Sequence, residues 1–393
     1  MNPLLGIGKG IASVADVLVL STPKGVKAAE KANLRAREIM AAHEHVVIGI
    51  SEPGHAVKNN PLRLYGQLTE NVGLMGRLQE ELERIYREEK PDLVIADFVV
   101  PVAGFTAIRH GIPWWTVTAS PSVIETPNGP PAYFNGQRPA RTALQRLMHV
   151  AMRWTTKGFK HIIWLLFWRV FQRIGFCGIY RSDGSEAVYS PHCILALGAK
   201  EIEFDCTWPK AVQFVGPVLY IPPYKGPLPA FRDDGRPCVL ISIGTHLMHA
   251  KDGMRNAIRS MAVLHPGIVF HFTHGNSVAA FARQEGNFHE YAFVSYLDYL
   301  PRYDLVVHHA GSGVMNHCLK HGIPAVVHPL DFDQFDNAAR LVAAGVAIAA
   351  PKLHDLETAI LRALHDEALK ARCAAMSRVV SVYNAVETIT KML

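Results

Sequence analysis

The sequence has few charged residues and no long hydrophobic run, and both scarcities limit what the protein can be. Only 19% of its 393 residues are charged, while 49% are hydrophobic, which excludes a disordered chain and a collagen-like repeat. The longest strictly apolar run covers seven residues, Ile162 to Trp168, whereas a membrane-spanning helix needs about 20. We expect a soluble chain, or one lying on a membrane surface, with about two domains.

Cysteine motifs are also lacking. The six cysteines form no C-x-x-C pair and no zinc-ligand spacing. We expect reduced, buried thiols, as in a reducing compartment. The apolar stretch 1–20 is interrupted by Lys9 and Asp16 and has no basic segment before it, so we do not expect a signal peptide. These features predict a cytoplasmic protein.

Acidic residues are absent between Gln137 and Ser182, where nine basic residues stand. Aromatic residues interleave with them, and apolar residues follow the helical period from 159 to 174. Three interpretations are open: a helix buried by its apolar face with a basic solvent face, an interfacial helix on anionic lipid, and a nucleic-acid-binding surface. No nucleic-acid-binding motif accompanies the patch, so that interpretation ranks last. A peripheral membrane contact through residues 138–181 stays open.

Two segments, 91–114 and 304–325, repeat one order of elements. Each reads as a β-branched strand, a loop, a helix ended by glycine and a strand opened by proline. Such a unit in each half predicts two doubly wound α/β domains with parallel sheets. Ligands bind at the carboxyl ends of the strands in such sheets, so the loops at Asp97, Gly244 and His309 are expected to line a cleft between the domains.

A proline- and glycine-rich stretch separates the two halves. We expect a domain over residues 1–216, a linker over 217–236 and a second domain over 237–375. Residues 376–393 are predicted to form a C-terminal helix that packs back towards the first domain.

A loop of small residues follows the strand of the second repeat: His309-Ala310-Gly311-Ser312-Gly313-Val314. Small residues let backbone N–H groups approach an anion, and the N-terminus of the following helix favours negative charge. His309 can add a charge-assisted donor. The pattern predicts a diphosphate site, although the G-x-G-x-x-G fingerprint is not met.

A carboxylate and an amide, Asp333 and Gln334, stand side by side after the next predicted strand. Together they can accept hydrogen bonds from, and donate them to, the neighbouring hydroxyls of a sugar. The alternative interpretation is a helix capped by Asp333 or Asp331.

These motifs together resemble the donor-binding signature of family-one, GT-B-fold glycosyltransferases. His-Ala-Gly-Ser-Gly is followed by Lys-His-Gly-Ile-Pro-Ala-Val-Val, by Pro-x-x-x-Asp-Gln-x-x-Asn-Ala and by Ala-Ala-Gly-Val. The resemblance implies two Rossmann-like domains that face each other across a cleft. It also implies inverting, metal-independent transfer of a hexosyl group from a nucleotide-diphosphate sugar, with no further cofactor.

The resemblance implies a donor site in the second half. His309 would contact the diphosphate, and Asp333 and Gln334 the sugar hydroxyls. The Gly244–Thr245 loop would lie beside the phosphates, and Phe293–Val294 would face the base. The other donor-binding residues expected belong to the small-residue loop and its helix: Gly311, Ser312, Gly313, Val314 and His317.

Three positions depart from the family pattern. His317 stands where the family has a glutamate that holds the ribose hydroxyls, Val314 replaces a hydroxyl residue, and Ser295-Tyr296 replaces Pro-Gln. A weakened ribose contact leaves a dTDP-sugar open, with a UDP-sugar as the default donor.

The first strand of the family and its catalytic base have no counterpart in the sequence. Met1-Asn2-Pro3 matches the end of the family's H-x-x-P motif, which places the base immediately before Met1. We expect Met1 to be an internal residue of a longer segment; a truncated, inactive relative and a chosen boundary are the alternatives. Asp97 stands where the family's acid orients that base, and bonding of loop amides is its alternative role.

Acceptor-binding residues are expected in the first half: Ser120, Thr126, Trp164 and Trp168. Many apolar and few acidic side chains there predict a hydrophobic acceptor, either a lipid or a secondary metabolite. Two other classes stay open. A catalytically impaired partner or activator protein fits the missing base, and a GT-B-fold sugar-nucleotide epimerase fits the fold but not the apolar acceptor region.

Overall fold

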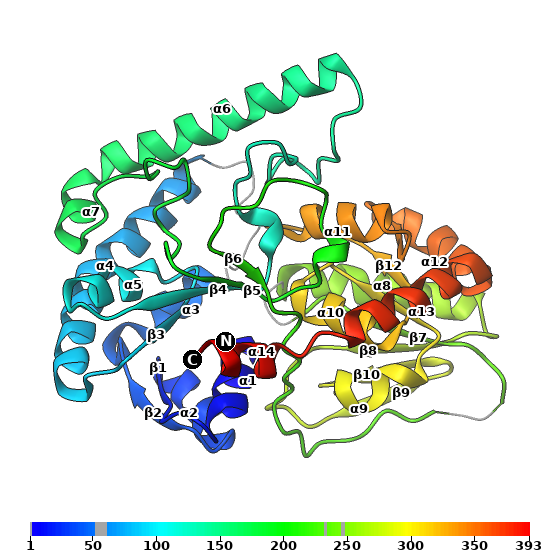
Figure 1. Cartoon of the computed structure of the whole chain (residues 1–393). Coiled ribbons are helices and arrows are strands. Elements are labelled where there is room, and N and C mark those ends of the chain that lie inside the picture. The colour runs from blue at the N-terminus through cyan, green and yellow to red at the C-terminus, as the bar shows by residue number, and fades with distance from the viewer. Residues whose placement is uncertain (1, 52–60, 232–233, 245–247) are drawn as a thin grey trace.

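A seven-stranded sheet forms the base of the C-terminal half, in the order β13-β12-β11-β7-β8-β10-β9 (Figure 1). All neighbouring strands pair in parallel except β9, which is antiparallel to β10. The strands are β7 (Cys238–Ser242), β8 (Val269–Thr273), β9 (Ala282–Glu285), β10 (Phe288–Tyr291), β11 (Leu305–His308), β12 (Ala325–Val327) and β13 (Ala347–Ala349). The computed structural model describes residues 2–51, 61–231, 234–244 and 248–393.

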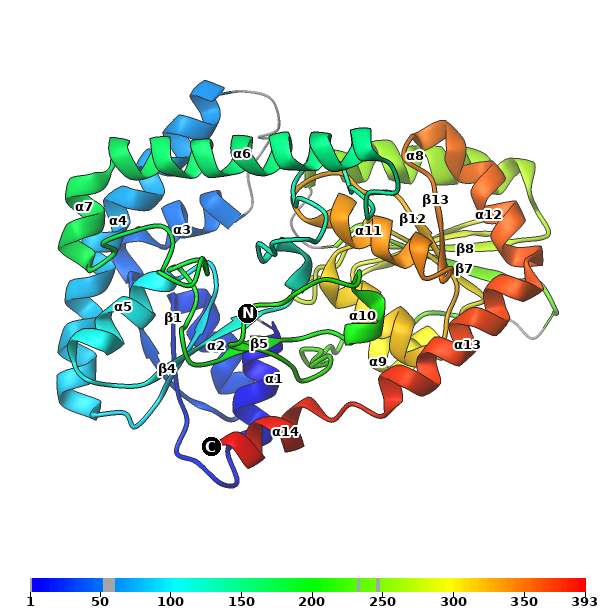
Figure 2. The same ribbon diagram turned by 45° about the horizontal axis from the view of Figure 1, so that its top comes forward.

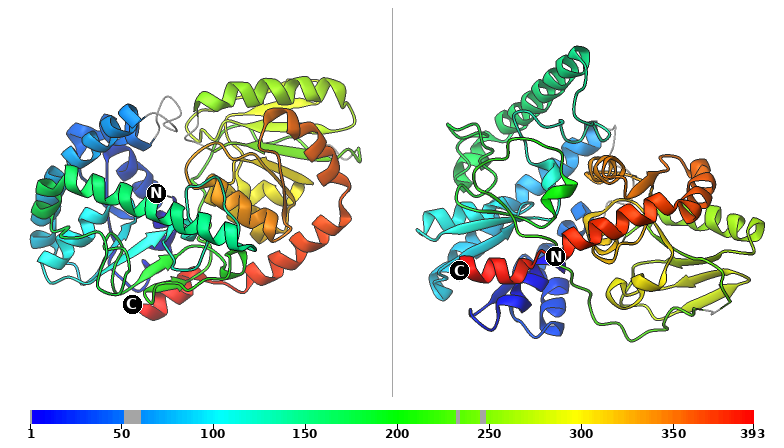
Figure 3. Two further views of the ribbon diagram at one scale, coloured as in Figure 1. Left: turned by 90° about the horizontal axis from the view of Figure 1, so that it is seen from above. Right: turned by 45° about the vertical axis from the view of Figure 1, so that its right-hand side comes forward.

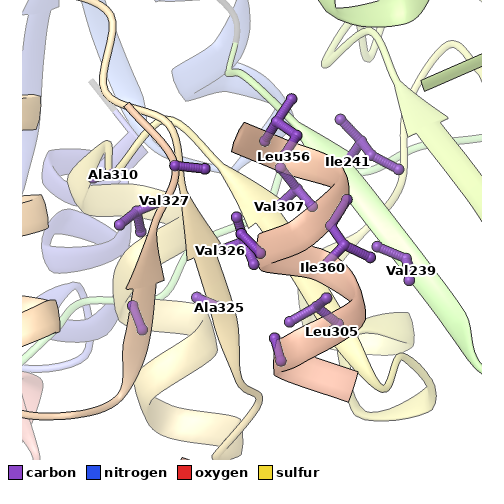
Figure 4. Packing of buried hydrophobic residues seen from close by; sticks show 14 of the residues in the cluster. Val239, Ile241, Leu305, Val307, Ala310, Ala325, Val326, Val327, Leu356 and Ile360 are labelled. Atoms are coloured by element: carbon purple, nitrogen blue, oxygen red, sulfur yellow. The ribbon is translucent and has the colours of Figure 1, made fainter. Parts of the chain in front are cut away.

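Helices cover both faces of this sheet, so its central strands are buried on both sides and read as continuous apolar runs. Figure 4 shows Leu356 and Ile360 of α12 against strand residues such as Val307. The helices are α8 (Met248–Leu264), α9 (Tyr296–Tyr299), α10 (Ser312–His321), α11 (Gln334–Ala343), α12 (Leu356–His365) and α13 (Glu367–Ser381).

The N-terminal half contains two parallel sheets among the described residues. One has the order β3-β4-β5-β6 and the other consists of β1 and β2. The strands are β1 (Leu18–Ser21), β2 (Arg35–Glu38), β3 (Val94–Asp97), β4 (Trp114–Thr118), β5 (Ile194–Ala196) and β6 (Val212–Phe214). Both predicted strand–helix–strand units are present, as β3-α5-β4 and β11-α10-β12.

Among the residues that the structure describes, seven helices accompany the N-terminal sheets, and short 3₁₀ turns connect elements in both halves. The helices are α1 (Asn2–Ile11), α2 (Pro23–Lys31), α3 (Glu44–Ser51), α4 (Pro61–Glu89), α5 (Pro101–Arg109), α6 (Ala143–Leu166) and α7 (Trp168–Ile174). The turns are η1 (Ala41–His43), η2 (Pro121–Val123), η3 (Lys200–Ile202), η4 (Leu300–Arg302) and η5 (Leu353–Asp355).

The end of the chain returns to the N-terminal half. Helix α14 (Ala385–Met392) packs on α1, where Ile389 is buried with Ile7 and Ile11. Figure 2 shows α14 beside α1, far from α12. The single helix predicted over 376–393 is instead two helices, α13 and α14, with a break between them. The break lets the chain change direction from one half to the other.

The basic segment forms α6 and α7, and the interpretation of a helix buried by its apolar face holds for α7 and the end of α6 but is wrong for the rest of α6. Within α6 only His149 is buried, whereas Trp154, Ile162 and Leu165 are 57–71% exposed. Figure 1 shows α6 along the outside of the molecule. None of the helices in the described ranges is long and apolar enough to cross a membrane.

Helix α5 packs tightly on β4 at Gly104, and a substitution of this glycine tests that packing. A Cβ there would lie 2.2 Å from Cε3 of Trp114, whose side chain is buried. Because overpacking forces neighbours to shift, we expect Gly104→Ala to lower the free energy of unfolding by about 1–3 kcal/mol. The control Gly73→Ala in α4 meets nothing within 4 Å and is expected to stabilise by up to about 1 kcal/mol. Urea unfolding measures both; equal stabilities would contradict the packing.

Candidate functional site

Parallel pairing of β7 with β11 brings two loops to one edge of the C-terminal sheet. Ser242 lies opposite His308, so Gly244 and His309 follow at neighbouring strand ends. A Cβ on Gly244 would lie 2.7 Å from His309 Cε1, and one on Gly311 would lie 2.3 Å from His309 Nε2. The imidazole therefore lies between two glycine backbones, and the φ of +76° at Gly244 also favours glycine. Thr245, predicted beside the phosphates, lies outside the described residues.

The N-terminus of α10 opens beside this imidazole. Gly311 is the N-cap and supplies no side chain, and the first hydrogen bond of the helix runs from Met315 N to Gly311 O at 3.1 Å. The N–H groups of Ser312, Gly313 and Val314 therefore have no partner within the helix. Three backbone donors and the positive end of the helix dipole can together hold an anion such as a diphosphate.

Val314 takes part in this site through its backbone and not through its side chain. The side chain is 4% exposed and packs with Val306 and Cys318 in a hydrophobic cluster beneath the sheet edge. The hydroxyl residue that the family has at this position is thus replaced by a core residue. A donor contact from Val314 is limited to its N–H group.

The turn after His308 is held in a strained conformation. Ala310 has a φ of +62°, a region that residues with a Cβ rarely adopt. Its N–H donates to Nδ1 of His308 at 3.0 Å, and its carbonyl accepts from Nδ2 of Asn337 at 3.1 Å. Burial lowers the pKa of His308 to about 3, which keeps the ring neutral and its Nδ1 able to accept. These bonds fix the loop that presents His309.

Asp333 occupies the N-cap position before α11, but its side chain makes no capping hydrogen bond. Its carboxylate accepts instead from the hydroxyl of Ser120, and Asn337 Nδ2 donates to the same oxygen at 3.2 Å. A carboxylate that already accepts from a hydroxyl is suited to a sugar. The alternative interpretation is therefore right that Asp333 stands at the N-cap and wrong that its side chain caps the helix.

Gln334 has a mainly structural role. Its side-chain oxygen accepts from the N–H groups of Leu330 at 2.9 Å and Asp331 at 3.1 Å, and the residue is 5% exposed. The oxygen thus holds the turn that carries Asp333. The sequence placed this amide beside a sugar; the structure assigns its oxygen to the protein itself.

Ser120 and Asp333 meet at the seam between the two halves, although they are 213 residues apart in sequence. Two further hydrogen bonds cross nearby: Ser122 Oγ donates to Asn337 Oδ1 at 3.0 Å, and Tyr133 N donates to Asp336 at 2.8 Å. The sequence analysis missed Asn337 as a site residue, although it belongs to the quoted Asp-Gln-x-x-Asn motif. The seam places one expected acceptor residue against the expected sugar site.

A buried ion pair also crosses the seam. Arg340 of α11 pairs with Glu203, and both side chains are almost fully buried. Burial raises the pKa of Glu203, and the guanidinium of Arg340 opposes that rise. Breaking such a pair leaves an uncompensated buried charge, so it fixes how α11 sits against the N-terminal half.

The remaining expected acceptor residues are not brought to Asp333. The Thr126 hydroxyl accepts from Gly129 N at 3.2 Å and stabilises a turn. Trp164 is half-buried against the core of the N-terminal half, and Trp168 is the first residue of α7. Figure 2 shows α7 at the far side of this half from α11, because α6 carries the chain away from the seam.

The expected base-binding and ribose-binding residues are all buried. The Phe293 ring is 9% exposed and lies 5.2 Å from that of Tyr224 in the linker, and Val294 is in the core. His317 is 3% exposed with its ring edge-on to Tyr296 at 5.4 Å. Burial lowers the pKa of His317 to about 4, so its ring is neutral and does not replace a glutamate.

Asp97 ends β3 and bonds its own loop. Its Oδ1 accepts from Val99 N at 3.1 Å, which is the alternative role given to it from the sequence. Burial raises the pKa of its carboxyl. Throughout the described ranges, no group of three His, Cys, Asp or Glu side chains is arranged to hold a metal ion.

Comparison with known proteins places these features in context. Residues 255–383 match the family model "Erythromycin biosynthesis protein CIII-like, C-terminal domain". The chain is 25% identical over 315 residues to 4'-demethylrebeccamycin synthase of Lentzea aerocolonigenes, covering 75% of this chain and 73% of that protein. A shorter segment of 90 residues is 38% identical to a sterol 3-beta-glucosyltransferase of Vanderwaltozyma polyspora. It spans 22% of this chain and only 7% of the yeast protein's length.

Solved structures match over the whole chain. The glycotransferase of kitacinnamycin has a TM-score of 0.74 at 19% identity and covers 100% of this chain and 94% of its own. A Streptomyces glycosyltransferase complexed with thymidine diphosphate has a TM-score of 0.64 at 16% identity, with 100% and 95% covered. These likenesses confirm the GT-B fold and the resemblance to GT-B glycosyltransferases.

Asp336, which lies at the seam between the two halves, makes the free energy of unfolding depend on pH. Burial raises the pKa of this carboxyl from 3.8 to about 6, so the folded protein keeps a proton that the unfolded chain releases. Stability contributed by the group therefore falls as the pH rises from about 4 to about 6. Asp336→Asn removes this loss while its side-chain oxygen can still accept from Tyr133 N. We expect the variant to gain about 1–3 kcal/mol relative to the original protein between pH 4 and pH 7. Urea unfolding at both pH values measures the difference; a constant difference would contradict the shift.

Proposed function

We propose that this protein is a glycosyltransferase that moves a hexosyl group, with inversion, from a nucleotide-diphosphate sugar to a hydroxyl of a hydrophobic acceptor. One observation carries the proposal: the anion site formed by His309 and the N-terminus of α10 shares an edge with Asp333, which already accepts from a hydroxyl. The glycosyltransferases among the matched proteins support the reaction class.

The diphosphate would lie at the N-terminus of α10. The three N–H groups of the first turn and the imidazole of His309 are fixed before any ligand binds, so they stabilise the leaving diphosphate without rearranging. No metal is needed for this role, because the helix end and the imidazole provide the positive potential.

The sugar would replace Ser120 on the carboxylate of Asp333. In the structure the Ser120 hydroxyl donates to this carboxylate, and a sugar hydroxyl offers the same donor group. Asn337 donates to the same carboxylate oxygen as Ser120 and would orient the carboxylate for the sugar. Donor binding would thereby exchange a bond between the two halves for a bond to the substrate.

Deprotonation of the acceptor would need a general base, which contributes about 10²–10⁴-fold in such reactions. Asp97 would act as a positioning residue for it, since its carboxylate lies at the carboxyl end of β3. Ser120 and Thr126 are proposed to line the acceptor side.

A UDP-sugar is the proposed donor, and a dTDP-sugar is the second candidate. The buried, neutral His317 favours the second candidate, because it offers the ribose no carboxylate. A matched Streptomyces structure contains thymidine diphosphate, which also supports that nucleotide. We propose a cytoplasmic location, with residues 138–181 close to a membrane if the acceptor is a lipid.

The diphosphate contact predicts a loss of nucleotide binding when the imidazole is removed or displaced. We expect UDP or dTDP to raise the Tm of the original protein. His309→Ala and Gly311→Ala should each weaken the binding of that nucleotide about 10–100-fold, which corresponds to the loss of a charge-assisted hydrogen bond. Gly253→Ala on the exposed side of α8, where a Cβ meets nothing within 4 Å, is the control. Absence of a shift with either nucleotide, from a folded sample, would refute the donor site.

The sugar contact predicts a different pattern for Asp333→Asn. Because this carboxylate is proposed to bind the sugar and not the diphosphate, the variant should bind UDP-glucose or dTDP-glucose about tenfold more weakly and the free nucleotide normally. Asp331→Asn is the matched control, since its carboxylate faces the N–H of Phe332 at 2.9 Å. Calorimetric titration measures the affinity of each variant for the nucleotide and for the nucleotide sugar. Equal losses of affinity for both ligands would contradict a contact between Asp333 and the sugar.

A further inference from the structure

Helix α6 presents an apolar face to the solvent along its whole length. We call this the outer face of α6, and its residues recur at the helical period: Leu144, Leu147, Met148, Ala151, Trp154, Thr155, Gly158, Phe159, Ile162, Leu165 and Leu166. All of them are exposed, and Trp154, Leu144 and Leu147 reach 66–71%. A 24-residue helix makes this face about 36 Å long.

The side of α6 that faces the protein is largely polar, although Ile163 and Trp164 near its C-terminus pack against the core of the N-terminal half. Arg153 Nη2 donates to the carbonyl of Gly129 at 2.6 Å, and Lys160 forms ion pairs with Glu125 and Glu186. His149 is buried on the same side. A surface helix of a globular protein normally has the opposite arrangement, with its apolar stripe on the core. These partly buried polar contacts, together with Ile163 and Trp164, fix the orientation of α6 and leave most of its apolar residues facing outward.

The outer face has no cover in the part of the chain that the structure describes. Figures 1 and 3 show α6 at the margin of the molecule, and in the right-hand view of Figure 3 it projects beyond both halves. Isolated exposed apolar residues need no explanation, but a continuous stripe of this length indicates a binding surface.

The charge around the outer face identifies what it binds. Exposed basic side chains lie on α6 and at its two ends: Arg138, Arg141, Arg146, Lys157, Arg169 and Arg173. Since no acidic residue occurs between Gln137 and Ser182, a second copy of the helix would bring like charges together. An anionic lipid surface instead supplies an apolar phase and the opposite charge at once.

We propose that the outer face of α6 docks on an anionic lipid bilayer, with the helix lying in the plane of the interface. In this proposal the acceptor is an amphiphile dissolved in that bilayer. That statement about the acceptor rests on the proposed function. The chain before α6 leads directly from the loop that contains Ser120 and Tyr133, and this loop contacts α11. Docking would therefore hold the seam between the halves close to the lipid.

Vesicle co-sedimentation tests the apolar contribution. We expect the protein to bind vesicles of phosphatidylcholine with phosphatidylserine, and to bind pure phosphatidylcholine much more weakly. The triple substitution Leu147→Ser, Trp154→Ser and Ile162→Ser should lower the partition coefficient at least about tenfold. Val263→Ser with Leu264→Ser, two exposed apolar positions on α8, is the control and should bind as the original protein does.

The charge contribution has its own variants. Arg138→Gln, Arg146→Gln and Arg169→Gln should each weaken binding to the anionic vesicles up to about fivefold, and the effect should shrink as salt is added. Arg362→Gln and Arg378→Gln, exposed on α12 and α13, remove the same charge at a distance and should leave binding unchanged.

Nucleotide binding by the same variants, without vesicles, separates this inference from the proposed function. Intact nucleotide binding with lost vesicle binding in the outer-face variant supports docking, whether or not the protein proves to be a transferase. The inference is overturned if the original protein does not bind anionic vesicles. It is also overturned if the outer-face variant binds them as well as the original protein does. A third result would also overturn the inference: the protein forms a concentration-dependent dimer, the triple substitution abolishes that dimer, and no vesicle binding is seen.

Discussion

The parallel pairing of β7 with β11 is the constraint on which the rest of this molecule depends. It brings the loops after both strands to one sheet edge, where the imidazole of His309 fits between Gly244 and Gly311 only because neither has a Cβ. The first turn of α10 then opens beside that ring. Fixed dipoles of this kind need no rearrangement to bind an anion, so the chemistry of the site follows directly from the strand register.

The two halves form one working unit because polar groups meet across their seam. Ser120 reaches Asp333, and Arg340 pairs with Glu203 in a buried position. Such pairs contribute little net stability compared with apolar packing, but they fix one relative orientation. Helix α14 adds an apolar connection, since Ile389 packs on α1 after the chain has left the C-terminal half. Helix α11 thus carries the polar contacts that join the proposed donor side to the N-terminal half.

Helix α6 follows a different principle from the rest of the fold. Elsewhere apolar faces point inward, as in the central strands of the C-terminal sheet. In α6 the partly buried ion pairs of Lys160 with Glu125 and Glu186 lie on the inward side, and most of the apolar residues are left outward. The cost of burying these charges is offset by their mutual attraction, and burial still raises the pKa of Glu186. An exposed apolar face maintained in this way implies an apolar partner.

The sequence alone determined the two α/β halves and the small-residue loop from His309 to Gly313, because strand, glycines and helix start are contiguous and their geometry is local. It could not show that Ser120 meets Asp333, since contacts between residues so far apart depend on how the halves pack. It also assigned Gln334 to the sugar, whereas local backbone N–H groups occupy its oxygen. For α6 the apolar period predicted an amphipathic helix. Only the tertiary structure decided which way that face points, because periodicity fixes a face relative to the helix axis and not relative to the rest of the protein.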